Sequence, residues 1–365
     1  MDVRLEVKQY GHLKVVLKSY GPNMINNLNQ KILKAEYIWL DGYDVQNIRS
    51  KVKYIKDMDS STVMVEDLPQ WNFDGSSTKQ ADGNSSDCVL KPVRIIPNGW
   101  DDSHLLVLCE VYNSDDTVHP SNTRAKLREL KAEYTGLEYW WGFEQEYFIF
   151  KDGKPLGWPA KGTPPPQGEN YCASGNKNVA GRSICEEHAE QCIASGMEIT
   201  GVNAEVTLGQ WEYQLFGKDT LEVCDNLILS RFLLAREAEG SGMDIELHPK
   251  PVMGDWNGSG CHINFSTRMT RDKGSKSYFQ AICERLEAHH DTHMKVYGLY
   301  NDQRLTGNHE TQDITKFSYG VSDRGASIRI PENVGKSWKG YLEDRRPSSN
   351  VDPYLATAAI VNTLR

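Results

Sequence analysis

The segment 141–150 is aromatic and apolar apart from a central polar stretch in which Glu144 and Glu146 stand two positions apart. If the segment is a strand, successive side chains alternate between its two faces, so both carboxylates emerge on the same face. Adjacent carboxylates repel each other and lose hydration in an apolar setting, so they need a divalent cation, a shared proton or an arginine partner. The alternative is an edge strand whose polar face is exposed to water.

A second acidic pair flanks a glycine. Glu205 and Glu212 stand on either side of Gly209 in the segment 201–216. Glycine permits a tight turn, so this segment could fold as a hairpin with the two carboxylates facing each other.

The segment 260–267 adds an imidazole. If it is a strand, His262, Asn264 and Ser266 share one face. A lone histidine is more often a structural residue than a ligand. Beside four carboxylates it becomes a candidate ligand, because hard divalent ions prefer oxygen and accept an occasional imidazole.

Arginines gather in the C-terminal part of this acidic chain, in runs rich in glycine and serine. They are Arg304, Arg324, Arg329, Arg345 and Arg346. Guanidinium groups bind carboxylate and phosphate oxygens bidentately, so the set predicts a clamp for an anion. The alternative for any one of them is an ordinary surface salt bridge.

Two motifs are incomplete. Residues 335–337 read Gly-Lys-Ser, like the end of a phosphate-binding loop, but Ile330 stands where the loop requires its first glycine. His289 and His293 have the spacing of a zinc-protease helix without the glutamate after the first histidine, so we predict a structural role for them.

The elements that position these residues fall into two parts. Strand-like runs at 35–40, 88–90 and 105–112, with no strong helix signal between residues 35 and 115, predict a small sheet-rich N-terminal domain. Beyond residue 116, helices alternate with strands. We expect a helix over 124–134 with Ser121 as its N-cap, helices over 219–239 and 275–296, and a last helix that begins at Asp352-Pro353. The expected strands are 141–150, 201–216, 260–267 and 324–331.

Composition sets the class of protein. The 365 residues carry 41 Lys and Arg against 50 Asp and Glu, a net charge of −9. The length predicts two domains and a core large enough for an enzyme. An acidic chain has no general attraction for nucleic acid or anionic membranes, so we expect neither as a partner.

The location is predicted to be cytoplasmic. No apolar run reaches the roughly 18 residues that span a bilayer, and the first residues do not resemble a signal peptide. Eight cysteines without a Cys-x-x-Cys pair indicate buried free thiols in a reducing compartment.

Several of these stretches, taken in order, resemble glutamine synthetase, specifically the eukaryotic-type subunit. The resemblance covers about residues 35–360. It rests on the residues at 71–78, 142–147, 203–206, 210–212, 256–258, 262, 304–307, 309–311, 324–329 and 341–347.

The resemblance implies an α+β protein: an N-terminal arm over 1–34, a β-grasp domain over 35–118, and a catalytic domain over 119–365 with a curved antiparallel sheet flanked by helices. It implies ligation of ammonia to the γ-carboxylate of glutamate through γ-glutamyl phosphate, with ATP as co-substrate and two or three Mg²⁺ or Mn²⁺ ions per site. It also implies a homo-oligomer, a decamer of two stacked pentameric rings.

The resemblance further assigns roles to individual residues. One metal would be held by Glu146, Glu205 and Glu212, and the metal that bridges the nucleotide phosphates by Glu144, His262 and Glu343. Glutamate would be bound by Arg304, Arg324 and Arg345 in a pocket shaped by Asp255, Trp256, Asn257 and Gly258. The nucleotide would contact Arg324, Arg329, Glu144, Glu212, Asn264, Phe265, Ser266 and Tyr341. The catalytic residues would be Asp74, Glu310, Arg329 and Arg345, with Asp74 and Ser77 contributed by a neighbouring subunit to bind ammonium.

Alternative functions remain open at this point. A catalytically inactive structural or regulatory oligomer would be free to lose ligands, whereas all six metal positions are filled here. A related enzyme could ligate another amine, such as a polyamine. A glycoside hydrolase would use Glu144 and Glu146 but leave His262 and the arginines without a role.

The sequence departs from the family pattern at four places, and none of them removes a proposed ligand or arginine. Leu208 stands where proline is usual, Phe216-Gly217 replaces Gly-Pro, Glu169-Asn170 replaces Pro-Tyr, and Asp323 replaces asparagine. These departures bear on nucleotide affinity and catalytic rate.

Overall fold

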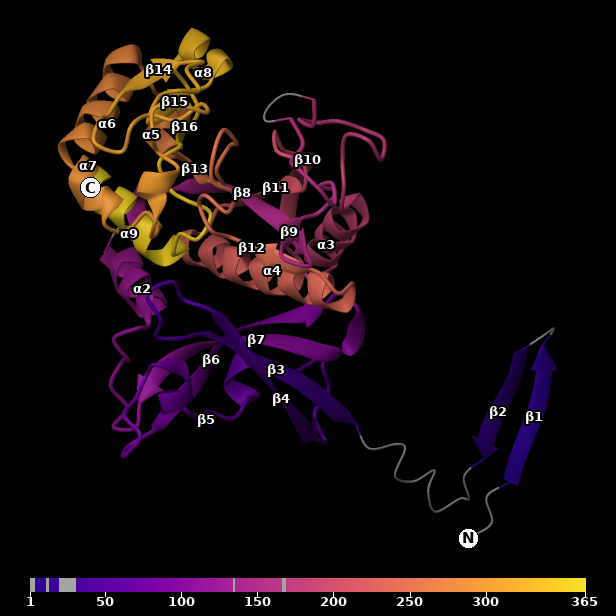
Figure 1. Ribbon diagram of the computed structural model, residues 1–365. Helices are drawn as coiled ribbons and strands as arrows, with labels where there is room; N and C mark the ends of the chain where they lie inside the picture. The colour runs from indigo at the N-terminus through magenta and orange to yellow at the C-terminus, as the bar shows by residue number, and fades with distance from the viewer. Residues whose placement is uncertain (1–3, 11–12, 20–30, 134, 166–168) are drawn as a thin grey trace.

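The computed structural model describes residues 4–10, 13–19, 31–133, 135–165 and 169–365 (Figure 1). Within the expected arm, strands β1 (Arg4–Tyr10) and β2 (Leu13–Ser19) pair as an antiparallel hairpin. The next strand, β3, already begins at Ile32. The division of the chain at residues 34 and 118 stays a prediction.

The N-terminal domain is a five-stranded mixed sheet in the order β4-β3-β7-β6-β5, in which only β3 and β7 run parallel. Its strands are β3 (Ile32–Leu40), β4 (Ile48–Lys56), β5 (Trp71–Asp74), β6 (Asp87–Asn98) and β7 (Asp101–Asn113). Two short 3₁₀ helices, η1 (Val65–Asp67) and η2 (Gly75–Thr78), flank β5. The three expected strands are confirmed, and each is longer than its apolar run.

The C-terminal part contains a second sheet, in the order β10-β11-β8-β13-β16-β15-β14. Its strands are β8 (Trp140–Lys151), β10 (Glu198–Ala204), β11 (Gln210–Gly217), β13 (Cys261–Ser266), β14 (Tyr319–Val321), β15 (Ile328–Ile330) and β16 (Leu342–Asp344), with β9 (Lys154–Pro155) and β12 (Asp244–Glu246) paired to β8. Every pair is antiparallel except β14 with β15.

Helices pack against this sheet and against one another, and those that contact β8, β10 and β11 cover one of its faces. The helices are α2 (Thr123–Glu133), α3 (Arg182–Ala194), α4 (Thr220–Gly240), α5 (Arg268–Asp272), α6 (Lys276–Ala288), α7 (His290–Met294), α8 (Glu332–Ser337) and α9 (Pro353–Leu364), with the short η3 (Thr135–Leu137) and η4 (Asn301–Gln303). The long helix α4 contacts β8 and β11 and lies between the two sheets (Figure 1). From β6, Arg94 Nη2 reaches Glu222 Oε1 of α4 at 3.0 Å, which ties the two parts together.

The alternation expected for segment 141–150 is present in β8. Trp141, Phe143 and Tyr147 are fully buried on the helix-covered side, where they form the main core with α4. Glu144 and Glu146 therefore point to the opposite, open face. The same alternation in β11 sends Trp211 and Tyr213 to the core and Glu212 to the open face.

Three local predictions are corrected. Helix α2 begins at Thr123, and its first turn is capped by Asn122 Oδ1, which accepts from Ala125 N at 3.1 Å; the predicted cap, Ser121, instead accepts from Gln80 Nε2 at 2.8 Å. Tyr134, the predicted last residue of this helix, lies outside the described residues.

The predicted helix over 275–296 is two helices, α6 and α7, because His289 between them has non-helical dihedral angles (φ −110°, ψ 13°). The predicted strand over 324–331 shortens to β15, since Asp323 Oδ1 accepts from Gly325 N at 2.9 Å and closes a turn that contains Arg324. The strand pattern was interrupted by a local side-chain hydrogen bond that apolar spacing does not report.

The structural role predicted for the histidine pair is confirmed for His293. His293 is buried, and its Nε2 lies 2.7 Å from Thr363 Oγ1 while its Nδ1 lies 3.0 Å from Arg346 Nη2. His289 is exposed and contacts the carbonyl of Arg285. Among the helices that the structure describes, none is both long and apolar enough to cross a membrane.

Helix α4 depends on its N-cap, which gives a stability prediction. Asp219 Oδ1 accepts from the amides of Leu221 and Glu222, both at 3.0 Å, and Oδ2 pairs with Lys131. Asp219→Ala is expected to lower the free energy of unfolding by about 1 kcal/mol, measured by urea denaturation. Glu239→Ala, which removes an exposed pair with Arg236 at the other end of the helix, should change it far less. Equal effects of the two variants would contradict the capping role.

Candidate active site

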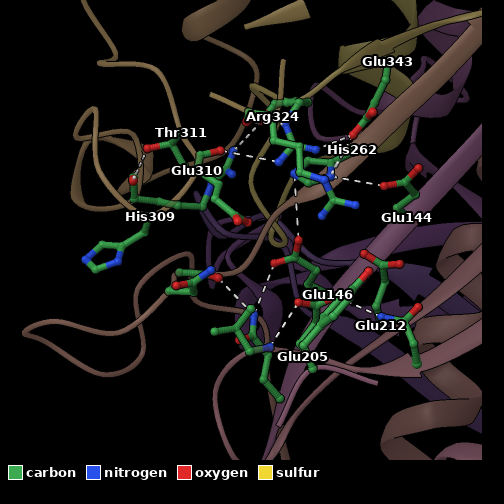
Figure 2. Close-up of a pocket in the computed structure, with 18 of the residues that line it drawn as sticks. Glu144, Glu146, Glu205, Glu212, His262, His309, Glu310, Thr311, Arg324 and Glu343 are labelled. Carbon is green, nitrogen blue, oxygen red and sulfur yellow. Dashed lines mark hydrogen bonds and ion pairs between the residues drawn. The ribbon is translucent and has the colours of Figure 1, made fainter. Parts of the chain in front are cut away.

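The open face of the catalytic sheet borders a cavity of about 470 Å³ (Figure 2). Thirteen of the predicted site residues line it: Glu144, Glu146, Glu205, Glu212, Asn257, Gly258, His262, Arg304, Glu310, Arg324, Arg329, Glu343 and Arg345. They come from five neighbouring strands, β11, β8, β13, β16 and β15, and from loops. The structure thus brings together residues that are up to 201 positions apart, from 144 to 345.

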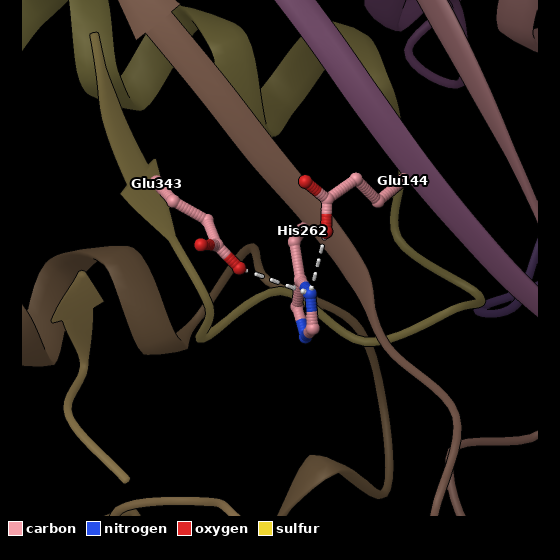
Figure 3. A group of neighbouring side chains, drawn as sticks. All are labelled: Glu144, His262 and Glu343. Atoms are coloured by element: carbon pink, nitrogen blue, oxygen red, sulfur yellow. Dashed lines mark hydrogen bonds and ion pairs between the residues drawn. The ribbon is translucent and has the colours of Figure 1, made fainter. Parts of the chain in front are cut away.

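A first group of ligand-type side chains consists of Glu144, His262 and Glu343, from β8, β13 and β16 (Figure 3). His262 Nδ1 lies 3.2 Å from Glu144 Oε2 and 3.4 Å from Glu343 Oε1. One ligand atom of each residue lies within 4.8 Å of those of the other two, a spacing that a single divalent cation can bridge.

Glu343 carries counter-charges of its own. It is 1% exposed, and its two carboxylate oxygens lie 2.5 Å from Arg329 Nη1 and 2.5 Å from Arg345 Nη1. Clustered carboxylates were expected to need a divalent cation, a shared proton or an arginine, and Glu343 has two arginine partners. The same two guanidinium groups remain close to any anion that enters the cavity.

The second group, Glu146, Glu205 and Glu212, has fewer partners. Glu146 Oε2 accepts from Gly260 N at 2.8 Å, and Glu205 Oε1 accepts from Asn203 Nδ2 at 2.9 Å. Burial, reinforced by the charge of Glu205, raises the pKa of Glu146 to about 8. Burial also raises the pKa of Glu205 to about 7 and that of Glu212 well above its usual range. Three carboxylates held close together in this way fit a divalent cation.

His262 stands between the two groups. Its Nε2 lies 3.8 Å from Glu146 Oε1, while its Nδ1 faces the first group. Burial, and then the charge of Arg345, lowers the pKa of His262 well below its usual value, so the ring is neutral and available as a ligand. A Cβ at Gly260 would lie only 2.8 Å from His262 Nε2, so glycine is required there for the ring to fit.

Arg304 is a fixed cation at the floor of the cavity. It is 5% exposed, and its Nη2 donates to the carbonyls of Arg345, Arg346 and Pro347 at 2.9, 2.9 and 3.0 Å. Burial lowers its pKa to about 10, which still leaves it charged near neutral pH. Three carbonyl acceptors hold the guanidinium in one orientation, a property that suits recognition of a carboxylate.

The loop that carries Glu310 is strained. His309 and Glu310 both have positive φ angles, 52° and 61°, in the left-handed region that such residues rarely occupy. His309 Nε2 pairs with Asp255 Oδ1 at 3.3 Å, which connects this loop to the loop of Asn257 and Gly258. Both loops border the cavity, and Glu310 faces into it (Figure 2).

Other predicted residues lie outside the cavity. Asp74 and Ser77 are on the N-terminal domain, where Ser77 Oγ donates to Asp74 Oδ2 at 2.7 Å. Phe265 and Ser266 are buried, so the Phe265 side chain belongs to the core. Asp255, Trp256, Asn264 and Tyr341 do not line the cavity either, but Asn264 Nδ2 reaches Glu144 Oε1 at 2.7 Å.

Sequence reasoning did not assign seven residues that line the cavity: Tyr171, Asn203, Val206, Gln210, Gln214, His309 and Thr311. Gln210 has the same strand parity as Glu212, so the period of two could have placed it on the site face. Tyr171 comes from an irregular loop and hydrogen bonds with Arg324, and no local pattern indicated it.

The departures from the family pattern have local roles. Leu208 O accepts from Trp158 Nε1 at 2.8 Å, and Asn170 Nδ2 donates to Val206 O at 3.1 Å. The Phe216 ring packs edge-on against Trp140 with centroids 6.0 Å apart. The cavity keeps all its predicted metal ligands beside these substitutions.

The fold and the site define a two-domain protein that gathers carboxylates, an imidazole and arginines on one sheet face. An enzyme that acts on anionic substrates with divalent cations requires such a set of side chains. Family models match both parts: "Glutamine synthetase, beta-Grasp domain" over residues 31–114 and "Glutamine synthetase, catalytic domain" over residues 121–283. The chain belongs to the glutamine synthetase family, as the sequence resemblance predicted, and the predicted α+β fold class is confirmed.

Named relatives support this assignment. A glutamine synthetase of Bradyrhizobium diazoefficiens is 50% identical over 337 residues, covering 91% of this chain and 96% of the relative. One of Saccharomyces cerevisiae is 45% identical over 332 residues, covering 90% and 88%. A solved structure described as "Apo GmaS without ligand" is 20% identical with a TM-score of 0.70, covering 93% of this chain and 78% of that one, and it supports the fold alone.

The raised pKa of Glu146 gives a prediction about stability without metal. The carboxyl has a pKa of about 8 in the fold against 4.5 when unfolded, so ionising it destabilises the native state progressively as the pH rises from 4.5 to about 8. Glu146→Gln removes that penalty. In the presence of a chelator, its Tm should exceed that of the unmodified protein by about 2–4 °C or more at pH 8 and much less at pH 5. A difference in Tm that does not depend on pH would contradict this explanation; exposed Glu332→Gln is the control.

Proposed function

We propose that this chain is a eukaryotic-type glutamine synthetase, which ligates ammonia to the γ-carboxylate of glutamate with ATP and releases glutamine, ADP and phosphate. The observation that carries the proposal is the convergence of six metal-ligand side chains and four arginines on one cavity. A glycoside hydrolase does not need both sets, whereas a ligase for another amine, such as a polyamine, would share them and differ at the amine site. The filled ligand set also disfavours an inactive structural or regulatory oligomer.

The chemistry requires an activated carboxyl group. Ammonia cannot displace an oxygen from a carboxylate, so ATP first converts the γ-carboxylate into γ-glutamyl phosphate, an acyl phosphate with a good leaving group. The two or three Mg²⁺ or Mn²⁺ ions, when held by the two glutamate groups and His262, would supply Lewis-acid stabilisation of the phosphate charge. The choice between the two metals is left to measurement.

The chain's own residues then orient and stabilise the reactants. Arg304, with its guanidinium held by three carbonyls, binds the glutamate carboxylate, next to Asn257 and Gly258. Arg345 and Arg329, 2.5 Å from Glu343, offset negative charge as phosphate is transferred, and Arg324 assists them. Glu310, on its strained loop, excludes water from the acyl phosphate. The adenine end of ATP would lie toward Asn264, Phe265, Ser266 and Tyr341.

Ammonium binding is assigned to Asp74 and Ser77 of a neighbouring subunit. Both lie outside this chain's own cavity and are exposed on the N-terminal domain. Hydrogen bonds from Ser76 and Ser77 lower the pKa of Asp74, which keeps it anionic as binding of a cation requires. A shared site of this kind agrees with assembly as a decamer of two pentameric rings, and we include this assembly in the proposal. The proposal also includes a cytoplasmic location, which the free cysteines suggest.

The shared site gives a prediction. Asp74→Ala should lower glutamine formation at limiting ammonium by about 100-fold or more while ATP binding is retained. Co-expression with Glu343→Gln should restore activity partly, because some sites in the mixed oligomer then combine an intact Asp74 with an intact Glu343. Absence of any restoration in mixed oligomers, or unchanged activity of Asp74→Ala, would remove the assignment.

The test of the function is phosphate release by the purified protein with ATP, Mg²⁺, glutamate and ammonium, omitting one component at a time. Release that needs all four, with glutamine as product, supports the synthetase. Release with other amines in place of ammonium favours the related ligase. A folded oligomer that releases no phosphate with either Mg²⁺ or Mn²⁺ would support the inactive alternative.

A further inference from the structure

One buried side chain in the cavity has an oxygen without a hydrogen-bond donor. Gln210 is the first residue of β11, is 1% exposed and lines the cavity on the same face as Glu212. Its Oε1 has no partner among the residues that the structure describes. Buried amide oxygens in folded proteins are nearly always hydrogen bonded, so this oxygen points to a missing donor.

The chemistry of its neighbours fixes which way the Gln210 amide faces. Its Nε2 lies 2.9 Å from Gly258 O, 3.2 Å from Glu146 Oε2 and 3.3 Å from Ser259 Oγ. The Gly258 carbonyl only accepts hydrogen bonds, and Glu146 Oε2 already accepts from Gly260 N, so the NH₂ group must occupy this side. A flipped amide would place Oε1 against the Gly258 carbonyl. The unpartnered oxygen is therefore a consequence of the surroundings.

The position of Gly258 indicates which donor arrives. Gly258 lies between Gln210 and Arg304: its carbonyl accepts from Gln210, and a Cβ built on it would lie 2.6 Å from Cγ of Arg304. Arg304 is the cation proposed to bind the substrate's carboxylate. In an α-amino acid the ammonium group is attached to the carbon next to the α-carboxylate, so it would lie close to Gln210 when Arg304 holds that carboxylate.

The surrounding charge favours a cationic donor. Glu146, which Gln210 contacts, is flanked by Glu205 and Glu212, and all three line the same side of the cavity (Figure 2). An ammonium group offers several N–H donors to such a set of acceptors, whereas an anion would be repelled. We infer that Gln210 is a specificity-determining residue whose Oε1 accepts a hydrogen bond from the α-ammonium group of the amino-acid substrate. This inference rests on the proposed function.

The test measures binding rather than turnover. Calorimetry with Mg²⁺ and a non-hydrolysable ATP analogue gives the Kd of glutamate and, by competition, that of glutarate, which lacks the α-ammonium group. Gln210→Met keeps the volume but removes the amide, and it should weaken glutamate binding by about 10- to 100-fold and leave glutarate within about threefold.

The chain offers a matched control. Gln191 on α3 is also buried, its Nε2 donates to Glu237 Oε2 at 2.9 Å and its Oε1 has no partner among the described residues, but it lies outside the cavity. Gln191→Met should leave both affinities unchanged, which separates a cavity role from the loss of a buried amide.

Three results would overturn the inference. Equal weakening of glutamate and glutarate by Gln210→Met would show that the α-ammonium group is not what Gln210 recognises. A loss of Mn²⁺ affinity with glutamate binding intact, measured by electron paramagnetic resonance, would show that Oε1 faces the metal. Failure of the unmodified protein to bind glutamate would remove the proposed function itself, a result distinct from the first two.

Discussion

Glu343→Gln is expected to lower the rate of glutamine formation by about 100- to 1,000-fold. Glu343 is 1% exposed and lies 2.5 Å from each of two guanidinium groups and 3.4 Å from His262. The substitution keeps the shape of the side chain but removes one negative charge from the centre of this cluster. Arg329 and Arg345 are then left facing a neutral group, and the predicted metal position loses one of its two carboxylates.

The effect should appear in two measurements. The Kd of Mn²⁺, followed by electron paramagnetic resonance, should rise together with the loss of kcat, and excess Mn²⁺ should restore activity only in part. Circular dichroism should show that the variant is folded. Glu332→Gln, at an exposed glutamate paired with Lys336, is the matched control and should leave both quantities unchanged. Normal Mn²⁺ affinity in Glu343→Gln would contradict its assignment as a metal ligand.

The second large effect is expected at Glu310. Glu310→Ala should lower glutamine formation by about 100-fold and raise the amount of phosphate released per glutamine formed, because water would then reach the acyl phosphate. The strained dihedral angles of His309 and Glu310 keep the side chain directed into the cavity. Asp255→Ala, which removes the 3.3 Å contact to His309, should change the ratio in the same direction but less, since Asp255 is 76% exposed.

Paired assays of phosphate and glutamine decide this prediction. Glu284→Ala, an exposed glutamate on α6, serves as control and should keep one phosphate per glutamine. If Glu310→Ala lowers both products equally, Glu310 contributes to binding or catalysis but not to exclusion of water. If it changes neither, the loop has no part in the reaction.

Local elements with a clear hydrophobic period could be predicted from the amino-acid pattern alone. The alternation in 141–150 placed Glu144 and Glu146 on one face of β8, and apolar spacing at 3.6 residues located α4 nearly to its ends. Asp352-Pro353 correctly started the last helix, α9, because a cap followed by proline is a local signal. The ordered motifs also identified the family, because residue types at many separate positions can be compared with the family pattern without knowledge of the structure.

How those elements meet depends on long-range packing and strand pairing. The register of β8, β13 and β16 brings Glu144, His262 and Glu343 together across 199 positions of sequence, and no local pattern encodes that register. A side-chain hydrogen bond selected Asn122 as a helix cap, and non-helical dihedral angles at His289 separate α6 from α7. The arrangement of Gln210 likewise depends on contacts with residues 146 and 258, which are distant in the chain. Periodicity reports which face of an element is buried, whereas the partners on the other face are fixed by the packing and strand pairing of the whole fold.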